Sequence, residues 1–478
     1  MRKYLKFYID GKWVKSMGTR TFDVINPANE EITGRVALGG MEDVNRAVAA
    51  ARRAFEIWSR TTRDERINVL GRIVEVYKTR FDDMCVAISE EMGAPAWVAR
   101  KAQAPAPLAH LKIAMEVLKN YSFEEVRGST LILREPIGVC GLITPWNWPA
   151  AVVSTKVVPC LATGCTMILK PSEYSPFSAQ ILAEVMDRAG VPPGVFNMVN
   201  GDGPVVGAAL ASHPDIDMIS FTGSTRAGVD IATKAAPTVK RVHQELGGKS
   251  PNIILEDADF EKSVAAGVRG VMFNSGQTCS APSRMLVPRS RMAEASSIAS
   301  RAVAEMAPGR PDEKAFMGPV VNKRQWKNIQ ALIHSGIGEG ATLVAGGDGN
   351  PAGLEVGFYV KPTIFADVTS DMTIAREEIF GPVLVIMAYD DVEDAIRIAN
   401  DTPYGLAAYI HGTDMEKMRE IGGRLRAGQV YMNGSGLDKV DPAAPFGGYK
   451  RSGNGREWGD FGFEAFLEVK ALIGYNPA

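Results

Sequence analysis

The stretch "TMILKPSEYSPFSAQILAEVMDRAG" (166–190) predicts a strand, a loop and a helix in one short segment. It opens on a short apolar run, which is typical of a strand buried on both faces of a parallel sheet. The helix that follows is marked at both ends: Ser175 is a plausible N-cap, Pro176 takes the first helical position, and Gly190 stops the helix. The stretch therefore predicts one strand–helix unit of an α/β fold.

Similar units lie on both sides of this stretch. Alternating strands and helices predict a doubly wound parallel sheet of Rossmann-like type. An amphipathic helix over 42–58 precedes the sheet, and "VIMAYDDVEDAIRIAND" (385–401) again reads strand then helix, so we expect a second α/β region after about residue 250. The other apolar runs are "IGVCGLIT" (137–144), "VFNMV" (195–199), "DMISF" (217–221) and "NIIL" (252–255).

Two segments alternate with a period of two residues, "STLILRE" (129–135) and "FLEVKALIGY" (466–475). We expect both to be strands of a small projecting sheet. They are either ordinary edge strands or strands whose exposed edge pairs with another subunit.

Length and composition narrow the class of protein. A chain of 478 residues is long enough for two or three domains. Its formal net charge of −2 gives no basic surplus for nucleic acid or an anionic membrane, and its apolar runs are too short to cross a bilayer. The start, "MRKYLKFYIDGKWV", predicts a hairpin at Asp10-Gly11 rather than a signal peptide. Five cysteines, an odd number, favour reduced thiols and a cytoplasmic protein, and the histidines show no metal-binding spacing.

Loops rich in glycine or polar residues follow the strands of the first sheet, which is where doubly wound sheets bind ligands. Gly223, in "FTGSTRAG" (221–228), precedes a helix and would let backbone N–H groups face a phosphate, although the spacing is not GxGxxG and a plain turn is the alternative. Lys170 and Glu173, in "LKPSEYSP" (169–176), are placed to bond ribose hydroxyls, and the acid favours NAD; the alternative is a solvated charge pair.

Cys279, in "NSGQTCSAPSR" (274–284), is the candidate nucleophile, because a reactive thiol needs a polar, partly exposed setting. The other four cysteines lie in apolar sequence and predict core residues. Asn147, in "TPWNWP" (144–149), is a candidate oxyanion donor. Glu245, in "HQELGGKSP" (243–251), is a candidate general base whose loop the two glycines would let move. Taken singly, each of these three residues is more simply explained by a structural role. Their combination in one chain favours a catalytic role.

With "EEIFGPV" (377–383) and "PFGGYKRSGNGRE" (445–457), these motifs resemble, in order and over nearly the whole chain, the aldehyde dehydrogenase superfamily. The resemblance implies that Cys279 adds to an aldehyde carbonyl, that Asn147 and the backbone N–H of Cys279 hold the oxyanion, and that hydride passes to the nicotinamide. Glu245 would then activate water against the thioester. Lys156 and Glu457 would form a buried pair that relays protons from the base.

The resemblance also implies a site for NAD, with NADP possible, a small-molecule aldehyde substrate, and a homo-oligomer, either dimer or tetramer. Lys170 and Glu173 would bind the adenosine ribose, Gly223 and Ser224 the pyrophosphate, and Glu378 and Phe380 the nicotinamide ribose and ring. The full expected cofactor set is Trp146, Lys170, Ser172, Glu173, Gly203, Phe221, Gly223, Ser224, Leu246, Glu378 and Phe380. The expected domains are an NAD(P)-binding domain (1–120 and 137–247), a catalytic domain (248–450) and an oligomerisation extension (121–136 and 451–478).

Other readings of the thiol remain. A CoA-acylating semialdehyde dehydrogenase would not need Glu245. A cysteine hydrolase without redox chemistry would need a histidine partner, and we expect His243, two residues before Glu245, to point away from it. A silent binding member would not need all three of Cys279, Glu245 and Asn147. Trp148 is expected to line the aldehyde tunnel, and the modest size of Ala151, Val152 and Thr155 leaves room for a bulky or long aldehyde.

Overall fold

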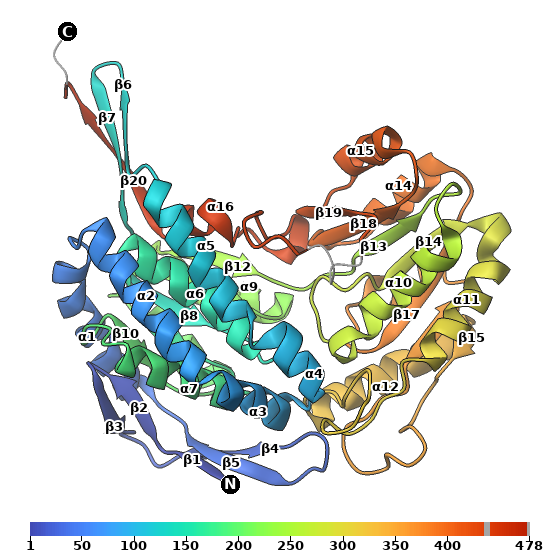
Figure 1. Cartoon of the computed structure of the whole chain (residues 1–478), viewed down its shortest axis with the longest axis horizontal. Coiled ribbons are helices and arrows are strands. Elements are labelled where there is room, and N and C mark those ends of the chain that lie inside the picture. Colours follow the sequence, from blue (N-terminus) through green and yellow to red (C-terminus); the bar gives the residue numbers. More distant parts are fainter. Residues whose placement is uncertain (435–439, 476–478) are drawn as a thin grey trace.

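The computed structural model describes residues 1–434 and 440–475 and has two lobes, each built on a sheet of seven strands (Figure 1). The first lobe holds mainly the N-terminal half of the chain and the second lobe most of the rest. Both are α/β, as predicted. Residues 435–439 of the expected catalytic domain and 476–478 of the expected extension lie outside the described residues.

The first sheet has the strand order β12-β11-β8-β9-β10-β2-β3. Five of its strands are parallel, but β2 and β3 form the predicted hairpin at Asp10-Gly11 and add to β10 antiparallel, so the sheet is mixed rather than wholly parallel. A hairpin joins an open edge without a crossover helix, which explains the difference. The strands are β2 (Lys6–Ile9), β3 (Lys12–Lys15), β8 (Val139–Ile143), β9 (Thr166–Lys170), β10 (Phe196–Met198), β11 (Met218–Thr222) and β12 (Arg241–Glu245).

Helices cover both faces of this sheet, because alternate residues of its strands point to opposite sides. In β9, Met167 and Leu169 pack with α6 and α7, whereas Ile168 packs with α1 and α8. The helices of this lobe are α1 (Met41–Trp58), α2 (Arg63–Thr79), α3 (Phe81–Met92), α4 (Ala96–Val98), α5 (Ala106–Asn120), α6 (Pro149–Thr163), α7 (Pro176–Arg188), α8 (Ala208–Ser212) and α9 (Thr225–Ala235).

The helix predicted from the opening stretch begins where expected but is capped differently. Ser175 is the N-cap of α7 and Pro176 its first residue, yet the Ser175 side chain makes no capping bond. The carboxylate of Glu91, on α3, instead accepts hydrogen bonds from the backbone N–H groups of Phe177 (2.5 Å) and Ser178 (3.1 Å). A buried carboxylate from a neighbouring helix thus satisfies the helix terminus.

The second sheet has the order β15-β16-β17-β14-β13-β18-β19 and is parallel except for β15. Helices α10 and α11 pack on one face, and α12, α14 and α15 on the other. The strands are β13 (Pro251–Ile254), β14 (Arg284–Pro288), β15 (Thr342–Ala345), β16 (Thr363–Ala366), β17 (Val383–Tyr389), β18 (Ala407–His411) and β19 (Gln429–Met432). The helices are α10 (Phe260–Met272), α11 (Met292–Ala304), α12 (Lys323–Gly338), α13 (Thr373–Arg376), α14 (Val392–Asn400) and α15 (Met415–Arg424).

A sheet of three strands, ordered β20-β7-β6, projects from the first lobe as an arm (Figure 1). The expected segments do form it, with β6 (Glu124–Arg127), β7 (Thr130–Pro136) and β20 (Leu467–Ile473). Residues 451–466 do not join the arm: helix α16 (Gly459–Glu464) packs against α5 and α6. A second small sheet has β1 (Arg2–Tyr4), β4 (Thr21–Ile25) and β5 (Ile32–Ala37). Among the described helices none is long and apolar enough to cross a membrane.

Candidate active site

Cys279 lies in a tightly held loop that follows α10. Asn274, Ser275 and Gly276 adopt positive φ angles of 52°, 56° and 72° in succession, a conformation that side-chain-bearing residues rarely take. A Cβ atom on Gly276 would fall 2.0 Å from the carbonyl oxygen of Gly381 in the second lobe, so this position requires glycine. Cys279 is partly exposed, whereas the other four cysteines are buried. The thiol singled out in the sequence is thus the accessible one.

The side chain of Asn147 points at the loop that carries the thiol. Its Nδ2 donates to the carbonyl oxygen of Gln277 at 3.1 Å, two residues before Cys279. Asn274 holds the two segments together, because its Nδ2 donates to the carbonyl oxygens of Asn147 (3.1 Å) and Gln277 (3.2 Å). Asn274 was not predicted as a site residue. An amide side chain within the motif of the thiol could have indicated it, because a buried amide needs hydrogen-bond partners.

Glu245 is the last residue of β12 and is buried, so it does not lie in a mobile loop as expected. Neither carboxylate oxygen has a hydrogen-bond partner among the described residues. Cβ atoms on Gly447 or Gly455 would each fall 2.8 Å from its Oε1, so these two glycines make the space for the carboxyl group. Burial and then the charge of Glu457 raise the pKa of Glu245 well above its usual value, while Lys156 and Arg456 lower it.

His243 points to the same side of β12 as Glu245, and the expectation that it points away was wrong. Side chains two residues apart in a strand share a face. A Cβ atom on Gly455 would lie 2.4 Å from His243 Nε2 and 2.8 Å from Glu245 Oε1. The His243 ring contacts the Ser220 hydroxyl (3.4 Å) and the Arg456 carbonyl (3.2 Å), and burial lowers its pKa to about 4. Both ring nitrogens of His243 therefore have partners other than the thiol of Cys279.

Lys156 and Glu457 form the expected buried ion pair, 2.7 Å from Nζ to Oε1. The Lys156 ammonium also donates to the Ser220 hydroxyl at 3.0 Å. Burial raises the pKa of Glu457, but the opposing charge of Lys156 outweighs it and holds that pKa below its ordinary value. Glu457 therefore stays ionised beside Glu245, whose own ionisation Glu457 opposes and Lys156 favours.

Although the residue Cys279 is partly exposed, the surroundings of its thiol favour the protonated form. Burial raises its pKa to about 12, and the carboxyl groups of Glu378 and Glu245 add to the effect. Glu378 itself has a pKa raised to about 7 by burial, and its Oε1 accepts from the backbone N–H of Gly248 at 2.9 Å. A cation placed beside Cys279 would counter these effects and favour the thiolate.

The carboxyl edge of the first sheet carries buried polar atoms that lack partners among the described residues. They are the Thr144 hydroxyl after β8, both amide atoms of Asn200 after β10, and the Thr222 hydroxyl at the end of β11. Buried polar groups normally have hydrogen-bond partners. Several unpartnered polar atoms lie here at the edge where doubly wound sheets bind ligands, so they indicate a binding site for a polar ligand.

The expected cofactor residues lie at this same edge and at the junction of the lobes. Lys170 Nζ donates to the carbonyl oxygens of Pro171 (2.8 Å) and Gly201 (2.6 Å) and lies 3.5 Å from Glu173. Ser224 caps α9, its hydroxyl accepting from the Ala227 N–H at 3.3 Å. The loops after the strands of the first sheet hold Trp146, Ser172, Glu173, Gly203, Gly223, Ser224 and Leu246, with Lys170 and Phe221 in strand ends.

Glu378 and Phe380 come from the second lobe, and the structure brings them to the first. The ring of Phe380 lies 5.3 Å from that of Trp146, nearly perpendicular to it. A Cβ atom on Gly247 would fall 2.3 Å from Glu378 Oε2. The two halves of the expected nicotinamide site therefore meet where the lobes join, beside Cys279.

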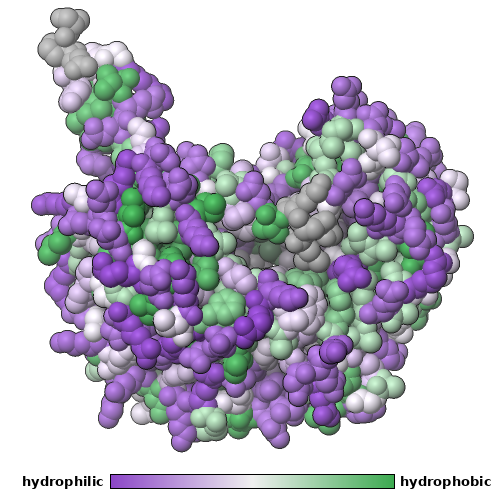
Figure 2. All heavy atoms as spheres, viewed as in Figure 1, coloured by the Kyte–Doolittle hydropathy of each residue, from purple (hydrophilic) through white to green (hydrophobic). Residues whose placement is uncertain are grey.

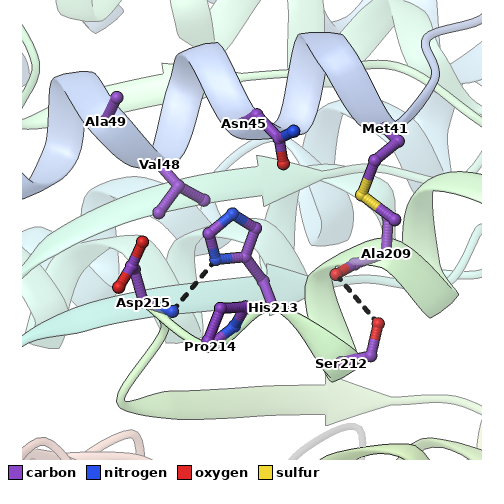
Figure 3. A pocket seen from close by; sticks show the side chains of 9 residues that line it. All are labelled: Met41, Asn45, Val48, Ala49, Ala209, Ser212, His213, Pro214 and Asp215. Atoms are coloured by element: carbon purple, nitrogen blue, oxygen red, sulfur yellow. Dashed lines mark hydrogen bonds between the residues drawn. The ribbon is translucent and has the colours of Figure 1, made fainter.

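Three cavities elsewhere on the described surface are lined by none of the predicted residues. One, of about 420 Å³, lies between α1 and α8, where His213 Nδ1 accepts from the Asp215 N–H at 3.0 Å (Figure 3). Two more, of about 730 Å³ each, are lined by residues such as Arg100 and Arg310, and by Arg66 and Phe123. Cavity size alone thus does not locate the chemistry.

Three cysteines distant from Cys279 converge in the core. The Sγ atoms of Cys140, Cys160 and Cys165 lie within 4.8 Å of one another, and all three residues are buried. They come from β8, α6 and the turn before β9, so the linear spacing gave no sign of this cluster. The expectation of no metal site stays a prediction.

Comparisons with known proteins agree with this geometry. A model of the aldehyde dehydrogenase family matches residues 13–472. A Pseudomonas sp. protein named 3-succinoylsemialdehyde-pyridine dehydrogenase is 54% identical over 478 residues, all of both chains. Aldehyde dehydrogenase C of Pseudomonas syringae, solved as a cysteine-to-alanine mutant with NAD+ and octanal, is 54% identical with a TM-score of 0.97, covering 99% of this chain and 97% of that one. The Mycobacterium tuberculosis aldehyde dehydrogenase with NAD+ is 40% identical with a TM-score of 0.96, covering 99% and 98%.

Proposed function

The chain belongs to the aldehyde dehydrogenase family, and from this premise we infer what each residue of the site does. It is an NAD-dependent oxidoreductase that converts an aldehyde to a carboxylic acid. The observation that carries the residue assignments is the position of Cys279, an accessible thiol next to the Asn147 amide and the Glu245 carboxyl, where the two lobes meet.

The residues at the first sheet fit a dinucleotide. The unpartnered Thr144, Asn200 and Thr222 offer polar atoms to it, and the N-terminus of α9 after Gly223 suits a pyrophosphate. Glu173 beside Lys170 favours two free ribose hydroxyls over a 2′-phosphate, so we propose NAD as the preferred cofactor and NADP as a poorer one. When bound, the dinucleotide supplies a hydride acceptor and a positive charge near the thiol.

In the first step, the Cys279 thiol releases its proton to solvent, the thiolate Sγ forms a bond to the aldehyde carbon, and the carbonyl oxygen becomes an oxyanion. The Asn147 Nδ2 and the backbone N–H of Cys279 hold that oxygen. One donor of this kind is typically worth about 3 kcal/mol of transition-state stabilisation. Re-forming the C=O bond expels hydride from the carbon and leaves an acyl thioester on Cys279.

In the second step, Glu245 removes a proton from water, and the water oxygen attacks the thioester carbon. The C–S bond then breaks, and Cys279 leaves as the acid is released. Because burial raises the pKa of Glu245, the proton it collects must be passed on before the next cycle. The Lys156–Glu457 ion pair, which already shifts the pKa of Glu245, is the proposed exit for that proton.

The alternatives considered for the thiol fit less well. A CoA-acylating enzyme does not need a base such as the buried, unpartnered carboxyl group of Glu245. A redox-independent hydrolase needs an imidazole at the thiol, and His243 bonds Ser220 and the Arg456 carbonyl instead.

We propose an apolar aldehyde as the substrate. On α6, Trp148, Ala151 and Val152 are partly exposed while residues 153–163 are buried, so this face borders the space next to Cys279. The Trp148 indole N–H donates to the Thr278 hydroxyl at 3.1 Å, beside the nucleophile. The 54% identical relative that was solved with octanal supports this choice.

We also propose a homo-oligomer that forms through the arm, and a cytoplasmic location. The edge strand β20 exposes Val469 (68%) and Ile473 (85%), and Figure 2 shows apolar side chains on the arm among hydrophilic ones. Unpaired apolar edge strands are templates for pairing with another chain. All five cysteines are free thiols, as in a reducing compartment.

The test is a panel of aldehydes, from short aliphatic to aromatic and carboxylated, assayed with NAD and with NADP. We expect NADH formation with apolar aldehydes and a lower kcat/KM with NADP. Mass spectrometry of enzyme quenched during turnover should find an acyl group on the peptide that contains Cys279. Turnover without an adduct on Cys279 under any condition would overturn the assignment.

A further inference from the structure

Three arginines line a cavity at the place where the arm joins the first lobe. The cavity has a volume of about 730 Å³, and residues of α1, α2, β6 and β7 border it (Figure 1). Arg63 and Arg66 lie one turn apart on α2 and therefore share a face of that helix, and Arg60 lies in the loop before it. We name these three residues the arginine triad.

The arginine triad forms no ion pair with a carboxylate of residues 1–434 and 440–475. Arg63 donates to the backbone carbonyl oxygens of Lys119 (2.8 Å) and Tyr121 (2.6 Å), and Arg60 is exposed and makes no side-chain hydrogen bond. Like charges one turn apart destabilise a helix. The protein therefore brings three positive charges together and bonds none of them to an acid.

Arg66 is only 6% exposed although it carries a charge. Its guanidinium donates to the Thr61 hydroxyl (2.9 Å) and to the carbonyl oxygens of Ser59 (3.0 Å) and Ala162 (3.4 Å). A guanidinium has five N–H groups, so two of them remain without an acceptor among the described residues. Burial lowers the pKa of Arg66, so the acids nearby do not compensate for the loss of water. A buried charge normally has a charged partner, and here that partner is missing from the chain.

The backbone makes room for the Arg66 guanidinium. Gly164 follows α6 with a φ of 91°, in the left-handed region that favours glycine. A Cβ atom on Gly164 would fall 2.5 Å from Arg66 Nη2. Backbone carbonyls, a hydroxyl and a glycine thus fix the side chain in place, and a group that is fixed before binding loses little entropy when a ligand arrives.

The other charged residues of the lining leave it positive. Arg134 lies 3.4 Å from Glu125, and Glu135 pairs with Lys470, so both residues already have partners. Glu124 is the remaining acid of the lining. The charges of the lining without an ion-pair partner are therefore those of the arginine triad against one carboxylate, and a ligand with two negative charges would balance them.

Part of the cavity wall is apolar. Phe55, Phe123 and Leu133 line it, and the Arg63 guanidinium carbon lies 5.9 Å from the centre of the Phe123 ring. The volume is in the range of sites for small organic ligands, which combine apolar walls with a few polar groups. Guanidinium groups match phosphate oxygens in geometry and charge. The lining therefore suits a phosphate group that is attached to a small organic part.

We propose that this cavity binds a small organic phosphate monoester, whose doubly charged phosphate group contacts the arginine triad. The organic part lies against Phe55 and Phe123. The site is separate from the one proposed for the dinucleotide, because none of the expected cofactor residues lines the cavity. Since β6 and β7 belong to the arm, a bound ligand connects the arm to α2.

The experiment measures binding to the full-length enzyme by isothermal titration calorimetry, with NAD+ at saturation so that the dinucleotide site is occupied. The probes are phenyl phosphate, phenyl sulfate, which has the same shape but one charge, and inorganic phosphate, which lacks the organic part. We expect phenyl phosphate to bind about tenfold more tightly than either of the others, because each lacks one of the two sets of contacts.

Variants of the arginine triad locate the binding. Arg60→Gln should weaken phenyl phosphate binding about tenfold, because it removes one charge-assisted hydrogen bond. Arg66→Lys keeps the charge but loses the planar fork, so it should also weaken binding. Arg419→Gln is the matched control, because Arg419 is exposed on α15 and has no side-chain partner among the described residues, and it should keep the wild-type Kd.

Two results would overturn the proposal. One is the absence of saturable heat with all three probes. The other is a Kd for phenyl phosphate that is the same in the wild type, Arg60→Gln and Arg66→Lys, with folding checked by circular dichroism. Inorganic phosphate that binds as tightly as phenyl phosphate would overturn the organic ligand and identify free phosphate as the ligand of the arginine triad.

Discussion

The Lys156 ammonium lies 2.7 Å from the Glu457 carboxylate, and both groups are buried next to the carboxyl group of Glu245. Lys156 lowers the pKa of Glu245 and of Glu457, and Glu457 raises that of Glu245. The ion pair therefore sets the pH at which the proposed base can work.

Replacing Lys156 by Met should move the acidic limb of the deacylation rate to higher pH. Without the positive charge the pKa of Glu245 rises further, so less of it is ionised at a given pH. The variant should also lose about 3–5 kcal/mol of stability, because Glu457 is left buried without a partner. The measurements are the pH dependence of deacylation and chemical unfolding. Adding Glu457→Gln should recover part of the stability, and an unmoved acidic limb would contradict the proposed coupling.

Replacing Glu245 by Gln should separate the two chemical steps. Thioester formation does not need the base, so about one NADH per active site should appear, after which turnover stalls. Stopped-flow absorbance of NADH measures the burst. Steady-state turnover at the wild-type rate would show that another group activates water.

The same Glu245→Gln variant should gain stability relative to the wild type as pH rises. A raised pKa in the folded state means that Glu245 contributes its stability while protonated, below its ordinary pKa, and loses it as pH rises through the folded value. Glutamine does not titrate. Thermal unfolding measured upward from pH 4.5, the ordinary pKa of the group, should therefore show a growing difference in Tm in favour of the variant, and a difference that is constant from that pH upward would count against the raised pKa.

The cysteines should differ sharply in a serine or alanine scan. Cys279→Ser should abolish NADH formation, because an alcohol at this position lacks the thiol's nucleophilicity. Cys160→Ala and Cys165→Ala should keep most of the activity, at a cost in stability from the small cavities they leave in the core. Equal losses of kcat in all three variants, measured on folded protein, would remove the special role of Cys279.

Alkylation of Cys279 by iodoacetamide should be slow at pH 8 and should accelerate when NAD+ is added. The ligand-free pKa of about 12 keeps the thiol protonated, and each unit by which the cationic nicotinamide lowers it raises the thiolate fraction about tenfold. Peptide mapping over a pH series would follow the modification, with the buried cysteines as internal controls. A free enzyme that reacts with a midpoint near 8.5, or equal rates with and without NAD+, would argue against this picture.

Much of the fold follows from sequence, because strands buried on both faces are continuous apolar runs and their helices carry clear start and stop signals. The strand and helix of 166–190 are both present. The N-terminus of that helix differs from expectation, because the carboxylate of Glu91 and not the hydroxyl of Ser175 accepts its backbone hydrogen bonds. Glu91 is far away in the chain, so the local sequence pattern cannot predict this contact.

The site was predictable as a set of motifs but not as an arrangement. Motifs place Cys279, Asn147 and Glu245 in order along the chain, whereas their contacts depend on how two lobes meet. The orientation of His243 could have been predicted correctly from the sequence, because residues two apart in a strand point to the same face. The convergence of Cys140, Cys160 and Cys165 could not have been predicted in this way, because it results from the packing of a strand, a helix and a turn.

Residues 453–457, near the C-terminal end of the chain, contact the residues of the site that come much earlier in the sequence. Gly453 bridges the strand end at Glu245, and Glu457 reaches back across 301 positions to Lys156. A ribosome has therefore synthesised more than nine-tenths of the polypeptide before both members of the proposed proton outlet, Lys156 and Glu457, are present. A chain that ends before residue 457 would therefore keep the thiol of Cys279 but lack the carboxylate that pairs with Lys156.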